Sequence, residues 1–181
     1  GETLKAERKR ITVLFADLTG FTTLTDRVEP ETMTELLNQY LGNMGELVEK
    51  YGGVLNEVLG DGVVAFFGAP EDMDKQEQGE RAVALAIAMQ REIVALGERW
   101  LKHGLDHNIQ LRIGIHQDFA TVGNFGSHDR IAYRAVGSGV ILAHRLQSEC
   151  TPGAILVSYA VYALTRERHP YAELQERNFK G

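Results

Sequence analysis

Residues 54–67 read VLNEVLGDGVVAFF, two short apolar runs on either side of a Gly-Asp-Gly turn. The runs are rich in valine and phenylalanine, which fit the half-buried surface of a strand. Asp-Gly readily supplies the positive backbone angles that a tight hairpin needs. The stretch therefore predicts a β-hairpin with strands over 54–58 and 63–67, and it places Asp61 in the turn.

The hydrophobic pattern on either side of this hairpin predicts alternating strands and helices. Upstream, ITVLFAD (11–17) is a buried strand that ends at an acid, and apolar residues at helical spacing follow from Pro30 until Gly52-Gly53. Downstream, the pattern predicts a long helix over about 76–103, strands over 109–115 and 120–125, a helix over 139–150, a strand over 154–158 and a helix over 159–167.

The order strand, helix, hairpin, helix, strand predicts an α+β fold. We expect a ferredoxin-like or palm-type βαββαβ core, in which helices cover one face of a largely antiparallel sheet, with a C-terminal extension. Residues 1–8 are assigned to a linker or to the end of an upstream helix, and 9–181 to one domain. In this arrangement 11–17 lies beside the hairpin, so Asp17 and Asp61 meet at the same edge of the sheet.

Composition narrows the class of protein. The chain has 181 residues, 44% of them apolar and 24% charged, which fits one globular domain. Its formal net charge of -6 argues against partners such as nucleic acid or an anionic membrane surface. No run approaches the roughly 18 apolar residues of a membrane span. The single cysteine, Cys150, excludes an internal disulfide, and its apolar surroundings predict burial and favour a cytoplasmic location.

Each of the two aspartates also has a purely structural explanation. Asp17 would cap a helix that starts near Thr19, and Asp61 would serve the hairpin turn. Together, two carboxylates at adjacent strand ends are what a two-magnesium phosphate site requires. The amides of Thr19, Gly20 and Phe21, at a helix start, would cradle phosphate oxygens.

Five sequence blocks, in this order and at this spacing, resemble the class III nucleotidyl cyclase catalytic domain over residues 9–181. They are FADLTGFT (15–22), LGDGVVAFFG (59–68), LRIGIH (111–116), VGNFG (122–126) and the helix that ends in Arg145. The resemblance implies a head-to-tail homodimer with active sites at the subunit interface. It further implies two Mg²⁺ or Mn²⁺ ions, held by Asp17, Asp61 and the backbone of Leu18, and conversion of ATP or GTP into a 3′,5′-cyclic monophosphate and pyrophosphate.

The resemblance also implies three basic residues around the triphosphate. Arg145 from the partner subunit would reach the α-phosphate and stabilise the charge of the transition state. Lys180 resembles the triphosphate-binding lysine of the family, and Arg130 is a further phosphate-contact candidate. Structural alternatives stay open here: Arg145 would pair with a surface acid, and Arg130 would be a solvated loop charge.

Two positions of the family read the purine base, and here they hold Glu57 and Arg134. A carboxylate accepts hydrogen bonds from N1–H and the 2-amino group of guanine, a donor pair that adenine lacks. Arg134 departs from the family pattern, although a guanidinium donates well to guanine O6. Glu57 therefore favours GTP. The alternative is that Glu57 and Arg134 neutralise each other across the subunit interface.

Ile141 stands where the family has an asparagine that orients the ribose. The loss of one preorganised donor of this kind costs about 10²- to 10³-fold in rate. His116 and His144 are too isolated for a zinc site, and Asp118 falls where the family often has glycine. We expect a homodimeric guanylate cyclase of reduced activity, regulated by an upstream domain. A catalytically degenerate cyclase-homology domain, an adenylate cyclase and a heterodimer with another cyclase subunit are the alternatives.

Overall fold

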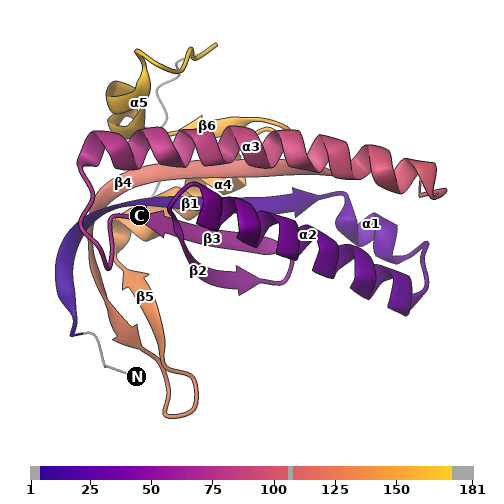
Figure 1. The fold of residues 1–181 in the computed structure, drawn as a ribbon, viewed down its shortest axis with the longest axis horizontal. Coiled ribbons are helices and arrows are strands. Elements are labelled where there is room, and N and C mark those ends of the chain that lie inside the picture. Colours follow the sequence, from indigo (N-terminus) through magenta and orange to yellow (C-terminus); the bar gives the residue numbers. More distant parts are fainter. Residues whose placement is uncertain (1–4, 106–107, 173–181) are drawn as a thin grey trace.

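The computed structural model describes residues 5–105 and 108–172 (Figure 1). In chain order, the elements are β1 (Glu7–Thr19), α1 (Phe21–Thr25), α2 (Pro30–Lys50), β2 (Val54–Leu59), β3 (Gly62–Phe67), α3 (Lys75–Lys102), β4 (Gln110–Phe125), β5 (Ala132–Val136), α4 (Ser138–Glu149), β6 (Ile155–Val157) and α5 (Tyr159–Thr165). The predicted α+β fold is confirmed. Strand β1 starts two residues before the predicted domain boundary at residue 9.

One six-stranded sheet organises the molecule. Its strand order is β2-β3-β1-β4-β5, and β6 pairs with β4. All pairs are antiparallel except β4 with β6. Strand β1 lies between β3 and β4, and most side chains of 11–16 are buried, on both faces of the sheet. An apolar run broken only by Thr12 is typical of such a strand.

Helices cover both faces of the sheet, which corrects the expectation of one covered face. In Figure 1, α2 and α3 lie in front of the strands and α4 lies behind them. The larger core cluster joins α2 and α3 to Leu14 and Ala16, whereas Val13 packs in a second cluster with Ala143 of α4. Alternate residues of β1 thus serve opposite faces, because successive side chains of a strand point to opposite sides.

The hairpin turn differs in detail from the prediction. Leu59 pairs with Gly62, so Gly60 and Asp61 form a two-residue turn. The positive φ of 62° falls on Gly60, and none of the described non-glycine residues has a positive φ. Glycine at the first central position of a two-residue hairpin suits the twist of the strands. The turn conformation therefore comes from the glycine before Asp61 rather than from Asp-Gly.

The prediction of separate strands over 109–115 and 120–125 was wrong, since β4 is continuous. Strand β1 pairs with β4 over residues 110–122, and two polar residues in the middle, His116 and Gln117, are buried with partners. His116 Nδ1 lies 2.8 Å from Ser158 Oγ, and Gln117 Nε2 donates to Thr12 Oγ1 at 2.8 Å. Strand β5, which the sequence did not predict, pairs with the end of β4.

Two further predictions concern Cys150 and the membrane. Cys150 is buried, as predicted. Among the helices within residues 5–105 and 108–172, none combines the length and the apolar character that a membrane crossing demands.

Candidate active site

Asp17 lies near the carboxyl end of β1, between the two strands that flank it. Its register partners are Gly62 of β3 and Arg112 of β4. Gly62 directly follows the hairpin turn, so the register brings Asp61 to Asp17. The predicted meeting of the two aspartates at one edge of the sheet is present in the structure.

Two side chains from distant parts of the chain hold Asp17. The Arg112 Nη2 donates to Asp17 Oδ2 at 3.3 Å, and Gln147 Nε2 of α4 donates to the same oxygen at 3.5 Å. Arg112 also donates to the carbonyl of Ser148 at 3.1 Å, near the end of α4. Helix α4 approaches this closely because Gly114 has no side chain, and a Cβ there would meet the backbone of α4.

The side chains of Asp61 and Asp17 lie close enough to share a hydrogen bond when one of them is protonated. Burial first, and then the hydrogen bond and the negative charge of Asp17, raise the pKa of Asp61 to about 6. Two carboxyls forced together in this way share a proton when no cation is present. Carboxylate oxygens are the ligands that Mg²⁺ and Mn²⁺ prefer, so the donor set fits a divalent cation.

The raised pKa of Asp61 predicts a specific dependence of stability on pH. Because the folded protein holds the Asp61 proton more tightly than the unfolded chain, with its ordinary value of 3.8, this group contributes stability below about pH 4. The contribution is lost as the pH rises to about 6. Urea unfolding of the metal-free protein should therefore show the free energy of unfolding falling over this window relative to Asp61→Asn, which cannot titrate. Parallel curves for the two proteins would contradict the prediction.

The predicted phosphate cradle follows β1 directly. Gly20, with a φ of 84°, precedes the five-residue helix α1, which receives no side-chain cap. Asp17 therefore does not cap this helix, and the first-turn amides have no side-chain acceptor from the cap position. The side chains of Leu18 and Phe21 are buried, so the backbone of 18–21 is what this segment offers to a ligand.

Glu57 and Arg134 lie together within one chain. Arg134 Nη1 is 3.6 Å from Glu57 Oε1, and each side chain is about one third exposed. They come from β2 and β5, the two ends of the strand order, which approach each other where the sheet curls. The two predicted base-reading residues are thus adjacent. The alternative from the sequence was an ion pair of Glu57 with Arg134 across the subunit interface, whereas here the two pair within one subunit.

Ile141 and Arg145 occupy the side of α4 that faces away from its own sheet. Gly139, Ala143, Leu146 and Gln147 are buried on the inner side. Ile141 is 56% exposed, and Arg145, one turn later on the same side, is half-buried. One helix therefore contributes Gln147 to the Asp17 cluster and directs Arg145 to the opposite side.

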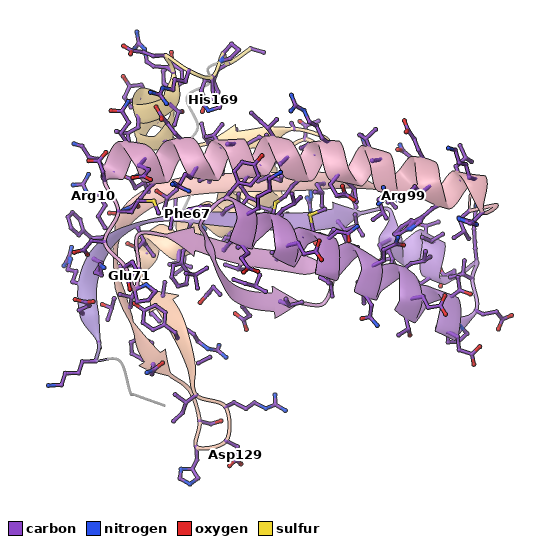
Figure 2. The ribbon with its side chains drawn as sticks, viewed as in Figure 1. Arg10, Phe67, Glu71, Arg99, Asp129 and His169 are labelled. Carbon is purple, nitrogen blue, oxygen red and sulfur yellow. The ribbon has the colours of Figure 1, made fainter. Side chains whose placement is uncertain are left out.

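The structure does not bring Arg130 to the carboxylates of its own chain. Arg130 lies in the exposed loop between β4 and β5, next to Asp129, which Figure 2 shows at the tip of the loop, away from the helices. The loop begins after Phe125, thirteen residues along β4 from Arg112, or roughly 40 Å of strand. A phosphate role for Arg130 stays a prediction, and its exposed position in the loop also fits the alternative of a solvated charge. Lys180 lies outside the described residues.

Sequence reasoning missed three side chains around Asp17 and Asp61. Arg112 follows the predicted strand start and was visible inside the LRIGIH block, although nothing local marked it as a partner of Asp17. Gln147 carried no signal, and Tyr40 carried only the helical periodicity of a core residue. Tyr40 of α2 is fully buried, and its hydroxyl has no hydrogen-bond partner among residues 5–105 and 108–172.

His116 is 9% exposed between Ser158 and Asp118, and burial lowers its pKa. Within the described part of the chain, no three His, Cys, Asp or Glu side chains gather as a metal-binding group. A metal ion at Asp17 and Asp61 would thus need further oxygen ligands from the backbone, water or a phosphate-bearing ligand.

Comparison with protein families identifies the class of this domain. The family model described as "Adenylate and Guanylate cyclase catalytic domain" matches residues 4–181. This chain belongs to the adenylate and guanylate cyclase family. It is therefore a class III nucleotidyl cyclase domain, as the five sequence blocks indicated, and its enzyme class is that of the nucleotidyl cyclases.

Solved structures of both specificities are similar to this cyclase domain. The adenylyl cyclase CyaB from P. aeruginosa is 38% identical, with a TM-score of 0.89 over 91% of this chain and 84% of that one. The guanylyl cyclase Cya2 is 32% identical, with a TM-score of 0.86 over 97% of this chain and 89% of that one.

A curated relative is much longer than this chain. Adenylate cyclase 1 of Rhizobium meliloti (strain 1021) is 29% identical over 97% of this chain, which spans only 26% of that protein.

Proposed function

We propose that this domain is a guanylate cyclase, which converts GTP into 3′,5′-cyclic GMP and pyrophosphate at the interface of a homodimer. The observation that carries the choice of purine is Glu57, held 3.6 Å from Arg134. The proposed setting is a cytoplasmic protein with an upstream regulatory domain. The alternative to the homodimer is a heterodimer with another cyclase subunit.

The side-by-side carboxylate and guanidinium match the polar edge of guanine. Guanine presents O6, an acceptor, next to N1–H and the 2-amino group, which are donors. Arg134 would donate to O6, while Glu57 would accept from the two donors. Adenine would instead turn its N1 acceptor toward the Glu57 carboxylate, and its amino group toward the cationic Arg134. Both contacts with adenine are repulsive, so the pair favours GTP.

Asp17 and Asp61, with the backbone carbonyl of Leu18, would hold two Mg²⁺ or Mn²⁺ ions. When bound, such ions lower the pKa of the ribose 3′-hydroxyl and neutralise the triphosphate. The chain itself supplies further positive potential through Arg112, whose Nη2 lies 3.3 Å from Asp17 Oδ2. From this position Arg112 would contact a phosphate oxygen. The amides of Thr19, Gly20 and Phe21 would bind the remaining phosphate oxygens.

Arg145 would act in the partner's site. It lies on the outer side of α4, whereas the inner side of the same helix contacts Asp17 through Gln147. A guanidinium in this position would stabilise the negative charge that develops on the α-phosphate. The outward direction of Arg145 therefore supports a dimeric site.

The proposal is tested by incubating the purified domain with Mn²⁺ and either GTP or ATP, and by measuring the cyclic product. Cyclic GMP should form, and it should form faster than cyclic AMP. Faster formation of cyclic AMP would overturn the assignment of Glu57 and would make the domain an adenylate cyclase. GTP binding without any product would instead indicate a degenerate cyclase-homology domain, an outcome that the exposed Ile141 at the ribose position also favours.

Replacing Ile141 with asparagine should raise kcat with GTP by about 10²- to 10³-fold. The asparagine would supply the side-chain hydrogen bond to the ribose that isoleucine cannot make. Ile141 is 56% exposed, so the substitution leaves the core intact. Ile141→Val, which changes the side chain without adding a donor, should leave kcat unchanged. An equal effect of the two substitutions would mean that position 141 does not contact the ribose.

A further inference from the structure

The hydroxyl of Tyr40 has no structural explanation in the fold. Tyr40 lies on α2 in a buried stripe with Leu36, Met44 and Val48, and it is fully inaccessible to solvent. Its ring fills the core, but its hydroxyl makes no hydrogen bond to the described residues. Because a buried polar group without a partner is costly, a phenylalanine of the same shape would serve the core better.

The surroundings of this hydroxyl point to the carboxylate pair. Helix α2 packs on β2 and β3, whose turn carries Asp61. Tyr40 belongs to the same core cluster as Leu18 and Phe21, which flank the end of β1. Burial first, and then the negative charges of Asp61 and Asp17, raise the pKa of Tyr40. The phenol is therefore a neutral donor on the core side of the two acids.

We propose that Tyr40 is a positioning residue of the metal site, whose hydroxyl donates a hydrogen bond to the Asp61 carboxylate through one bridging water. This inference rests on the proposed function, in which Asp61 holds divalent cations. Carboxylates that bind metals are commonly oriented by such outer hydrogen bonds. The ring is suited to the task because the surrounding core fixes its two torsion angles, so the hydroxyl is preorganised.

Tyr40→Phe removes the hydroxyl and keeps the ring. We expect the variant to bind Mn²⁺ about 10-fold more weakly than the wild-type domain, the lower end of the usual effect of an outer hydrogen bond on metal affinity. Binding is measured by electron paramagnetic resonance of free Mn²⁺ and by the Mn²⁺-dependent rise of the unfolding midpoint. The midpoint without Mn²⁺ should stay the same or rise, because an unsatisfied buried group is removed.

Kinetics separate positioning from a purely structural role. The Mn²⁺ concentration for half-maximal activity should rise about 10-fold in Tyr40→Phe, while kcat at saturating Mn²⁺ stays close to that of the wild type. Tyr51→Phe is the matched control, since Tyr51 is the C-cap residue of the same helix. Removing its hydroxyl should not affect Asp17 or Asp61. It should bind Mn²⁺ as the wild-type domain does.

The inference would be overturned if Tyr40→Phe bound Mn²⁺ with wild-type affinity, or if Tyr51→Phe lost as much Mn²⁺ affinity as Tyr40→Phe. Neither result would contradict a metal site at Asp17 and Asp61. Asp61→Asn distinguishes this from a failure of the proposed function. If Asp61→Asn binds Mn²⁺ as well as the wild type does, or if the wild type does not bind Mn²⁺, the metal site itself is misplaced and both proposals fail.

Discussion

Replacing Asp17 with asparagine should lower cyclic GMP formation at least about 10³-fold, because the contribution of metal ions to a phosphoryl-transfer transition state is several kcal/mol. The loss should appear in kcat at saturating Mn²⁺ and GTP, measured by quantifying the cyclic product. Asparagine preserves the shape of the side chain but removes the charge that binds the cation. The same substitution at Asp61 should have an effect of the same order.

The fold should tolerate Asp17→Asn. Asp17 and Arg112 are each about 30% exposed in their ion pair, and partly exposed pairs contribute only about 0–1 kcal/mol to stability. The unfolding midpoint in the absence of metal should therefore change little. Asp118→Asn is a control for the chemical change, since Asp118 contacts His116 and the amide of Phe119, outside the cluster of Asp17. Full activity of Asp17→Asn would remove the basis for catalysis at this edge of the sheet.

Arg145→Ala should lower kcat by about 10³-fold, the lower end of the effect of an arginine that stabilises the transition state of phosphoryl transfer. The substitution lies on the outer side of α4, so the packing of the inner side against the sheet should persist. Arg145→Lys should recover only part of the rate, because an ammonium lacks the planar fork of a guanidinium. A decrease in GTP affinity without a decrease in kcat would assign Arg145 to ground-state binding instead.

Mixing two inactive variants tests whether Arg145 acts across the dimer interface. A heterodimer of Asp17→Asn and Arg145→Ala would contain one intact site, formed by Asp17 of one subunit and Arg145 of the other. Random exchange in a two-fold dimer makes half of the dimers mixed, each with one of two sites working, so about a quarter of wild-type activity should return. If mixing restores nothing although exchange is complete, Arg145 and Asp17 serve the same chain.

The sequence predicted the parts of the site that depend on local patterns. Asp17 follows an apolar run that reads as a buried strand, and Asp61 sits in a hairpin turn between two further apolar runs. Local periodicity is enough for such elements, because burial and turn geometry act over a few residues. The same local reasoning split β4 in two, since the polar residues 116–118 looked like a break. Neither the burial of His116 and Gln117 nor their hydrogen-bond partners were visible in the sequence.

Arg112 and Gln147 show why the rest required the fold. They meet Asp17 from 95 and 130 residues away, through the antiparallel register of β1 with β4 and the close approach of α4 at Gly114. Tyr40 shows the same for burial, because periodicity places its ring in the core but cannot tell what its hydroxyl faces.

The sequence by itself was enough to identify Asp17 and Asp61 as the candidate acids, to predict the hairpin and to indicate the family. These depend only on residue type and on spacing along the chain. Only the tertiary structure decided which side chains surround the acids, that Glu57 pairs with Arg134 within one subunit, and that α4 turns Arg145 away from its own sheet. The physical reason is that strand register and helix packing are set by contacts between residues far apart in the chain, and no local pattern encodes which of them meet.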